Sequence, residues 1–258
     1  MQDFNDTDQH FLFVATAGMA LAALLFLYYQ LNAKEERSRL VFVIAFFCTA
    51  ISCFSYFAMA SGYGVFVTAN GLLIFWARYI DWMITTPLTL VIIGIVAQAK
   101  FEETFFLVLA DVLMVLCWLC FAVVAAPFKY VWWSIGTLLF LVVVLRLNSV
   151  VQDSESRIGP ATHDVLKTLS LITLAMWLGY PVMILLGADG VAAIPTKAEL
   201  GCLTLLDLSA KVCPALFELA TLPIFFIPLF YLLTQAGAFI YLLFNVDVLA
   251  AKASLSSQ

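Results

Sequence analysis

Charge is what this sequence has least of. Only 11% of its 258 residues are Asp, Glu, Lys or Arg, whereas 64% are hydrophobic and the mean hydropathy is +1.06. A soluble domain carries about 25% charged residues and is roughly half apolar. The composition therefore excludes an ordinary water-soluble domain and predicts a multi-pass integral membrane protein whose main partner is the lipid bilayer.

The sequence also lacks the motifs of common soluble enzymes. It has no glycine-rich nucleotide loop and no cluster of metal ligands, and all six cysteines fall inside apolar runs. Cysteines in such runs pack as small hydrophobic side chains. We therefore expect neither an enzyme nor a metal protein, and no nucleic-acid partner.

Long apolar runs account for nearly the whole chain. A helix needs about 20 apolar residues to cross a bilayer. Eight runs meet that length: 11–33, 40–60, 71–98, 103–125, 128–148, 165–187, 199–221 and 224–246. The fold class that follows is an all-α membrane protein, a seven-helix bundle with an additional C-terminal apolar helix.

The last apolar run is expected to stand apart from the others. Pro223 and Pro228 oppose a simple continuation of the seventh helix. We divide the chain into a seven-helix domain at 1–222 and an extra segment with a polar tail at 223–258. That segment either spans the membrane as an eighth helix or packs on the bundle, on a second copy or on another membrane partner.

Basic residues gather at alternate ends of the runs and predict the orientation. The loops after the first, third and fifth runs carry Lys34, Arg37, Arg39, Lys100, Arg146, Arg157 and Lys167, whereas the opposite side carries Lys129 and Lys197. Because basic loops stay in the cytoplasm, the N-terminus is expected outside the cell. The hydrophilic stretch 149–164 reads as a cytoplasmic loop, and the outer loop 61–71 reads as irregular or as a short hairpin.

One apolar run holds two opposite charges, in the stretch RYIDWMITTP. Arg78, Asp81 and Thr85 stand at helical positions i, i+3 and i+7, so they share a face. Ile92 follows Asp81 by about three turns on that face. A buried charge is costly unless it is paired or functional. A structural pair between Arg78 and Asp81 is one interpretation.

The seventh run favours a functional interpretation. In LLDLSAKV, Asp207 and Lys211 are four residues apart and therefore lie on one helical face. A lysine near the middle of a membrane is expensive, and lysine is also the residue that forms Schiff bases with carbonyl compounds. The cation would need carboxylate counterions, and Asp207 and Asp81 supply them from two helices.

These two stretches are where the sequence resembles a known family, the microbial rhodopsins of the bacteriorhodopsin-like type. The resemblance covers roughly residues 11–220 and includes WARYIDW, AD at 110–111, VWWSIGT, WLGYPV and LDLSAKV. It implies that Lys211 binds all-trans-retinal as a Schiff base, with Asp81 as counterion and proton acceptor. The resemblance places Asp207, Arg78, Thr85 and Tyr56 around that pair, with Thr85 within hydrogen-bonding reach of Asp81.

The resemblance also implies a retinal pocket and an exit for protons. The pocket would contain Trp82, Thr86, Thr89, Asp111, Met114, Trp118, Trp133, Gly136, Thr137, Trp177, Tyr180, Ile184 and Ala210. Within it, Thr86 is expected to pair with Asp111, and the bulk of Trp118 is expected to be balanced by the smaller Ile184. Asp189 and Glu199 occupy the positions of the family's proton-release carboxylates.

One position departs from the pattern of the family's proton pumps. They carry a carboxylic acid where this chain has Ile92, and isoleucine has no proton to give. The resemblance therefore implies proton transfer to Asp81 and slow outward transport, with protons or other small ions as cargo. A sensory photoreceptor that signals through a partner and a light-gated channel stay open as alternatives.

Overall fold

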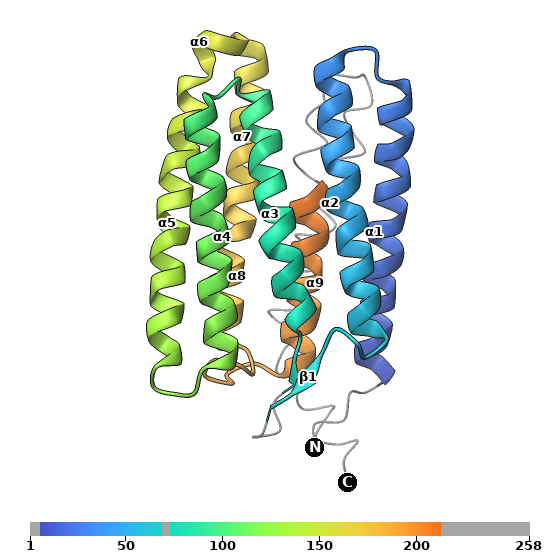
Figure 1. Cartoon of the computed structure of the whole chain (residues 1–258), viewed down its shortest axis with the longest axis vertical. Coiled ribbons are helices and arrows are strands. Elements are labelled where there is room, and N and C mark those ends of the chain that lie inside the picture. The colour runs from blue at the N-terminus through green and yellow to red at the C-terminus, as the bar shows by residue number, and fades with distance from the viewer. Residues whose placement is uncertain (1–5, 69–72, 213–258) are drawn as a thin grey trace.

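The computed structural model of the chain describes residues 6–68 and 73–212, and these fold almost entirely into helices (Figure 1). The helices are α1 (Asp6–Asn32), α2 (Glu36–Ala60), α3 (Trp76–Val96), α4 (Phe101–Val123), α5 (Lys129–Asp153), α6 (Glu155–Ile158), α7 (Pro160–Trp177), α8 (Gly179–Leu186) and α9 (Thr196–Val212). The segment 223–258, predicted as an eighth helix or as a surface for a partner, lies outside the described residues, and so does the domain boundary at 222.

The long helices lie side by side and run along the long axis of the molecule (Figure 1). Each helix packs on its neighbour in sequence, and α9 packs on α1, which closes the ring. In the most apolar part of α3, 61% of the residues are buried, against 28% in α1. The charged face of α3 therefore points into the bundle, as its sequence pattern predicts.

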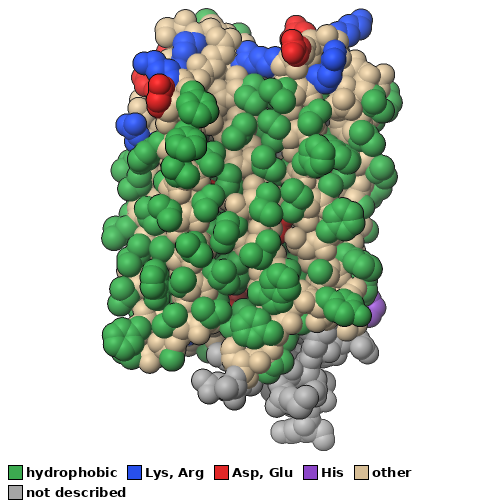
Figure 2. Space-filling model, in the orientation of Figure 1, with side chains coloured by type: hydrophobic (Ala, Val, Ile, Leu, Met, Phe, Trp, Pro, Cys, Tyr) green, Lys and Arg blue, Asp and Glu red, His purple; other side chains and the backbone are tan. Residues whose placement is uncertain are grey.

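The outside of the bundle is apolar along its length and charged at one end (Figure 2). Within the described residues, six helical segments are long and apolar enough to cross a membrane, and α7 with α8 forms one of them, Pro160–Leu186. The described part of α9 is the seventh helix of the bundle. Lys34, Arg37, Lys100 and Arg157 lie where α1 meets α2, α3 meets α4 and α6 meets α7; we call this the basic end.

The prediction of a loop over 149–164 was wrong. The chain stays helical through Asp153, forms α6 and re-enters a helix at Pro160, whose ring is tolerated in the first turn. Arg157 explains why this connection is ordered. Its guanidinium donates to the carbonyls of Gln98 and Val150 at 3.1 Å each, and it lies 3.6 Å from Glu103. Hydrophilic composition here reflects exposure to water, not loss of helix.

The end opposite the basic end carries a two-stranded hairpin, which the loop sequence allowed as one interpretation. Strands β1 (Phe66–Val67) and β2 (Leu73–Ile74) pair antiparallel, with Phe66 opposite Ile74. The hairpin shortens the third helix relative to prediction, because α3 begins at Trp76 and not at 71. We call this the hairpin end. It places residues of β2 next to the first turn of α3.

Candidate functional site

The charged residues of α3 and α9 meet in the middle of the bundle. The Lys211 ammonium donates to a carboxylate oxygen of Asp81, and it lies 4.0 Å from Asp207 Oδ1. Lys211 is 4% exposed and both aspartates are 0% exposed. The alternative of a structural pair between Arg78 and Asp81 receives no support, since the cation that Asp81 contacts is Lys211. Helical spacing brought the right side chains to one face, and the ring closure brought the faces together.

Asp207 is held by neutral donors from three other helices or turns. Its carboxylate accepts hydrogen bonds from the Tyr56 hydroxyl, from Trp82 Nε1 at 2.7 Å and from the Tyr180 hydroxyl at 2.9 Å. Tyr56 comes from α2, Trp82 from α3 and Tyr180 from α8. Hydrogen bonds of this kind stabilise a carboxylate as an anion. The carboxylate of Asp207 is thus held in place in the wall of the site by three hydrogen bonds.

Asp81 has fewer donors, and one of them was not foreseen. Ser52 Oγ on α2 lies 2.8 Å from Asp81 Oδ1, but the same hydroxyl lies 2.9 Å from the carbonyl of Cys48 and has a single proton to share. The expected hydrogen bond between Thr85 and Asp81 is present, and Thr85 donates to the main-chain carbonyl of Asp81 at 2.8 Å. A threonine inside a helix commonly bonds the carbonyl four residues back.

Ser52 could have been found from the sequence by its spacing. It precedes Tyr56 by four residues, so it lies on the same face of α2 one turn nearer the basic end. Cys48 continues that face by another turn, and its thiol contacts the carbonyl of Thr85 at 3.2 Å. Polar atoms at that spacing in an apolar helix indicate a shared function, which tertiary packing then defines.

Arg78 lies between the cluster of Lys211, Asp81 and Asp207 and a cavity at the hairpin end. Its side chain is buried and lies over the ring of Phe75 at 5.3 Å. It interacts electrostatically with Tyr56 and Asp207 on one side and with Glu199 on the other. The cavity beyond it has a volume of about 390 Å³, and Arg78, Tyr79, Asp189 and Glu199 are among its lining residues.

The loop after α8 supplies Asp189, and the first turn of α9 supplies Glu199, the two carboxylates predicted at this end. Glu199 accepts a hydrogen bond from the amide of Ala188 at 2.8 Å, and Lys129 donates to the main-chain carbonyl of Asp189. Burial raises the pKa of Asp189 to about 6, although Lys129 and Arg78 oppose the shift. The structure therefore brings Arg78, Asp189 and Glu199 together, and it adds Tyr79, which the sequence did not suggest.

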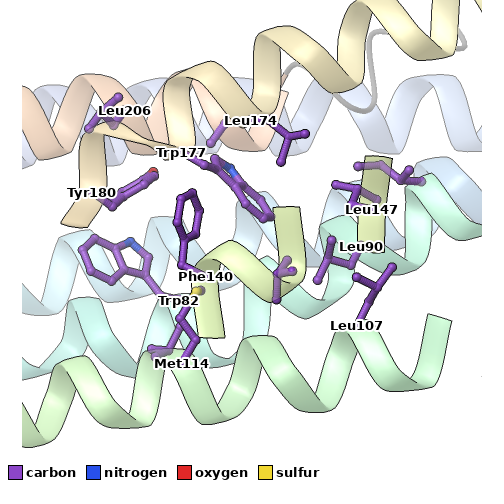
Figure 3. Close-up of a cluster of buried hydrophobic side chains, with 14 of the residues drawn as sticks. Trp82, Leu90, Leu107, Met114, Phe140, Leu147, Leu174, Trp177, Tyr180 and Leu206 are labelled. Atoms are coloured by element: carbon purple, nitrogen blue, oxygen red, sulfur yellow. The ribbon is translucent and has the colours of Figure 1, made fainter. Parts of the chain in front are cut away.

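An apolar cavity, which we call the aromatic cavity, lies beside Trp82 and Tyr180. Figure 3 shows these two side chains close to Phe140 and Trp177. The volume of the aromatic cavity is about 290 Å³, and it is lined by Trp82, Thr86, Asp111, Met114, Val115, Trp118, Phe140, Trp177 and Tyr180. Seven of these nine were expected, and Val115 and Phe140 were not. Thr86 donates to the Asp111 carboxylate, as predicted for this pair.

Several residues predicted for the pocket do not line this cavity. Trp133 donates from Nε1 to the carbonyl of Pro181 at 3.0 Å and so ties α5 to α8. Thr89 bonds the carbonyl of Thr85 at 3.1 Å. Thr137, Ile184 and Ala210 are wholly or partly buried in the bundle and are likewise absent from its lining.

Trp118 is accommodated by a residue on the neighbouring helix. A Cβ added to Gly136 of α5 would lie 2.6 Å from both Cδ1 and Nε1 of Trp118, so the indole fills the space that a side chain there would need. The missing side chain of Gly136 therefore leaves a notch in the surface of α5 that the Trp118 indole fills. The predicted exchange of volume with Ile184 remains a prediction, whereas the contact with Gly136 is direct.

The aromatic cavity and the Lys211 cluster share two walls. Trp82 and Tyr180 both line the cavity and both donate to Asp207, which lies beside Lys211. Retinal is an apolar polyene with an aldehyde, so it needs an aromatic slot that leads to a buried amine with a counterion. The residues present fit that group. Together the fold and the site define the class of retinal-binding, seven-helix membrane proteins.

Comparison with known proteins identifies the family. Residues 6–224 match the family described as bacteriorhodopsin-like protein. The chain is 32% identical over 206 residues to a bacteriorhodopsin from Haloterrigena sp. (strain arg-4), a match that covers 78% of this chain and 82% of that one. The chain therefore belongs to the bacteriorhodopsin-like family of microbial rhodopsins, whose members bind retinal as chromophore.

Solved structures show the same fold. A thermophilic rhodopsin from Rubrobacter xylanophilus superposes with a TM-score of 0.79 at 32% identity, covering 83% of this chain and 95% of that one. A structure described as a light-driven proton pump from Leptosphaeria maculans gives a TM-score of 0.77 at 29% identity, covering 84% and 96%. The chain is thus a multi-pass integral membrane protein of the rhodopsin fold.

Proposed function

We propose that this rhodopsin moves a proton from the Lys211 nitrogen to Asp81 in the light and releases protons slowly on the hairpin side. The contact that carries this proposal is the buried one between Lys211 and Asp81. Retinal, when bound, supplies absorption of visible light and an isomerisation that changes how strongly the Lys211 nitrogen holds its proton. The residues around it decide where that proton goes.

Asp81 is the acceptor because the two carboxylates are supported unequally. When the lysine nitrogen loses its charge, Asp207 keeps its three donors from Tyr56, Trp82 and Tyr180. Among the described residues, Asp81 keeps only Ser52 as a donor, whose proton is also close to a main-chain carbonyl. An anion that loses its cation and has few other donors gains most from taking up a proton.

Arg78 and the hairpin-end cavity support release on that side. Protonation of Asp81 removes a negative charge from one side of Arg78, so its guanidinium is attracted more strongly to the carboxylates on the other side. Glu199 already interacts with Arg78, and Asp189 lines the same cavity. A cation that shifts toward these two groups favours their charged forms and so the loss of a proton. We place the basic end in the cytoplasm, so the direction is outward.

The surroundings of Ile92 favour a signalling receptor as the second candidate. Ile92 is buried, and the cavity beside it contains no Asp, Glu, His or Lys among its described lining residues. Return of the proton then has to wait for one from water at the basic end. A long-lived light state suits signalling, because it gives a partner time to respond.

Electrical recording in cells supplied with retinal tests the proposal. A pump drives outward current at zero voltage, a channel current reverses with the ion gradient, and a pure sensor gives only a transient charge movement. Steady outward current, small in amplitude, is the expected result. Current that reverses with the gradient, or no steady current at all, contradicts outward transport.

A variant at Ile92 tests the missing donor separately. In the native protein the recovery time should lengthen as pH rises, by up to about tenfold per pH unit if proton supply alone limits recovery. Ile92→Asp places a carboxylic acid in an apolar site, where burial keeps it protonated and ready to donate. Flash spectroscopy should show faster and less pH-dependent recovery. A native protein that already recovers quickly at every pH has another donor, and the reasoning fails.

A further inference from the structure

A third cavity lies between the central site and the basic end. Its volume is about 240 Å³, and Ile92 and Val96 of α3 face Leu166, Ser170 and Thr173 of α7 across it. Val96 is the last residue of α3, and Arg37 donates to its carbonyl and to that of Ile95. The cavity therefore begins beneath the rim of the bundle at the basic end.

The inner limit of this cavity adjoins the aromatic cavity. Thr173 precedes Trp177 by four residues on α7, so the two lie one turn apart on the same face. Trp177 lines the aromatic cavity. Ser170 stands another turn nearer the basic end, about 10 Å from Trp177 along the helix axis. Along α7, this cavity thus follows the aromatic cavity in the direction of the basic end.

Ser170 of α7 carries a buried polar group. Its side chain is 5% exposed, and its hydroxyl oxygen makes no hydrogen bond to the described residues. This differs from the usual behaviour of hydroxyls in this bundle. Thr168 on the same helix donates to the carbonyl of Asp164 at 2.8 Å, and Ser134 on α5 bonds Tyr130 in the same way at 2.9 Å. The Ser170 hydroxyl is left available to a group inside the cavity.

Water is the molecule that we expect to bind in the cavity beside Ser170. Buried polar groups that the protein does not satisfy are commonly bridged by internal water, which needs at least two polar partners and about 10–15 Å³ of space for its centre. Ser170 and Thr173 present two hydroxyls one turn apart, and the space open to water centres in the cavity is about 10 Å³, enough for one water. No titratable side chain is among its described lining residues, so water is also the only proton carrier that these residues can hold.

We propose that Ser170 and Thr173 hold water in this cavity and so form the last stage of proton uptake from the basic end to the Lys211 nitrogen. The inference rests on the proposed function, in which that nitrogen loses a proton in the light. A proton from bulk water is taken up by the water in this cavity, that water gives one of its protons on toward the nitrogen, and hydroxide remains in the bulk. Ser170 is a positioning residue, because it orients water and exchanges no net proton.

Flash spectroscopy on the retinal-loaded protein tests the role of Ser170. Ser170→Ala should slow recovery about fivefold at fixed pH, the worth of one hydrogen bond. The visible band and the rate of transfer to Asp81 should not change, because neither involves this cavity. Ser170→Thr keeps a hydroxyl and should restore most of the native rate. Thr168→Ala is the matched control, since it removes an exposed hydroxyl from the same helix, and it should recover like the native protein.

The outcomes separate this inference from the proposed function. If the native protein never loses the proton from the Lys211 nitrogen, the proposed function fails and this inference with it. If it does, but Ser170→Ala recovers at the native rate, only the inference is overturned. A crystal structure of the retinal-loaded protein gives an independent readout: we expect a water within about 3.2 Å of Ser170 Oγ, and a dry cavity there overturns the proposal.

Discussion

Gly136→Ala is the substitution whose effect can be worked out most directly from the structure. The added methyl would lie 2.6 Å from two atoms of the Trp118 indole, whereas ordinary contact begins at 3.4 Å. The indole must therefore retreat by the difference, about 0.8 Å. Phe140, one turn along α5, already lies against it with ring centroids 6.2 Å apart. Trp118 also lines the aromatic cavity, so movement of its indole changes the shape of that cavity.

The expected cost of this movement follows from the tight packing. Forcing an extra methyl into a well-packed interior costs about 1–3 kcal/mol. If that cost falls on the retinal-bound state, the affinity for retinal drops roughly 5- to 150-fold. Titration of the retinal-free protein with all-trans-retinal measures it through the visible band, which should also shift because the wall of the chromophore pocket has moved.

A double variant provides the control for this prediction. Trp118→Phe removes the part of the indole that meets the new methyl, so Trp118→Phe/Gly136→Ala should bind retinal better than Gly136→Ala alone. The coupling between the two changes should be about 0.5–3 kcal/mol, the range for residues in contact. Additive effects, or a Gly136→Ala protein with native affinity and colour, would refute the notch that we assign to Gly136.

The remaining predictions concern the charged residues. Lys211→Ala should give colourless protein even with excess retinal, because it removes the amine that would form the Schiff base; a coloured variant that resists borohydride in the light contradicts the assignment. Asp81→Asn should shift the visible band and abolish light-induced proton transfer, and an unchanged spectrum across a pH titration counts against its role as counterion. Asp189→Asn tests the raised pKa. Because the pKa of Asp189 rises from 3.8 to about 6 on folding, its contribution to stability is full below pH 4 and is lost as pH rises through 6, so the variant should gain up to about 3 kcal/mol at pH 7 and nothing at pH 4. Loss of colour on heating at both pH values measures this, with the exposed Asp153→Asn as control, and a gain that is equal at both pH values rules it out.

The apolar helices and the charged pair of Asp81 and Lys211 could be predicted from the sequence. Asp81 and Lys211 were found because a charge in a long apolar run has few explanations, and because helical spacing assigns side chains to a face without reference to any other helix. Ile92 was found in the same way, as the residue on the Asp81 face where the family pattern expects an acid. The prediction of a loop over 149–164 was wrong because the polarity of a segment indicates its exposure to water and not its backbone conformation.

The contacts between residues of different helices could not be predicted from the sequence. Which donors hold Asp207 and which hold Asp81 depends on the packing of α2, α3 and α8 around α9, and no spacing within one helix contains that information. Ser170 reads as an ordinary helix serine until α3 is placed opposite it and a cavity is left between them. The same holds for Gly136, since the need for a residue without a side chain is set by the indole of Trp118 on α4. Such contacts join residues far apart in the chain, so their energies appear only when the ring of helices closes.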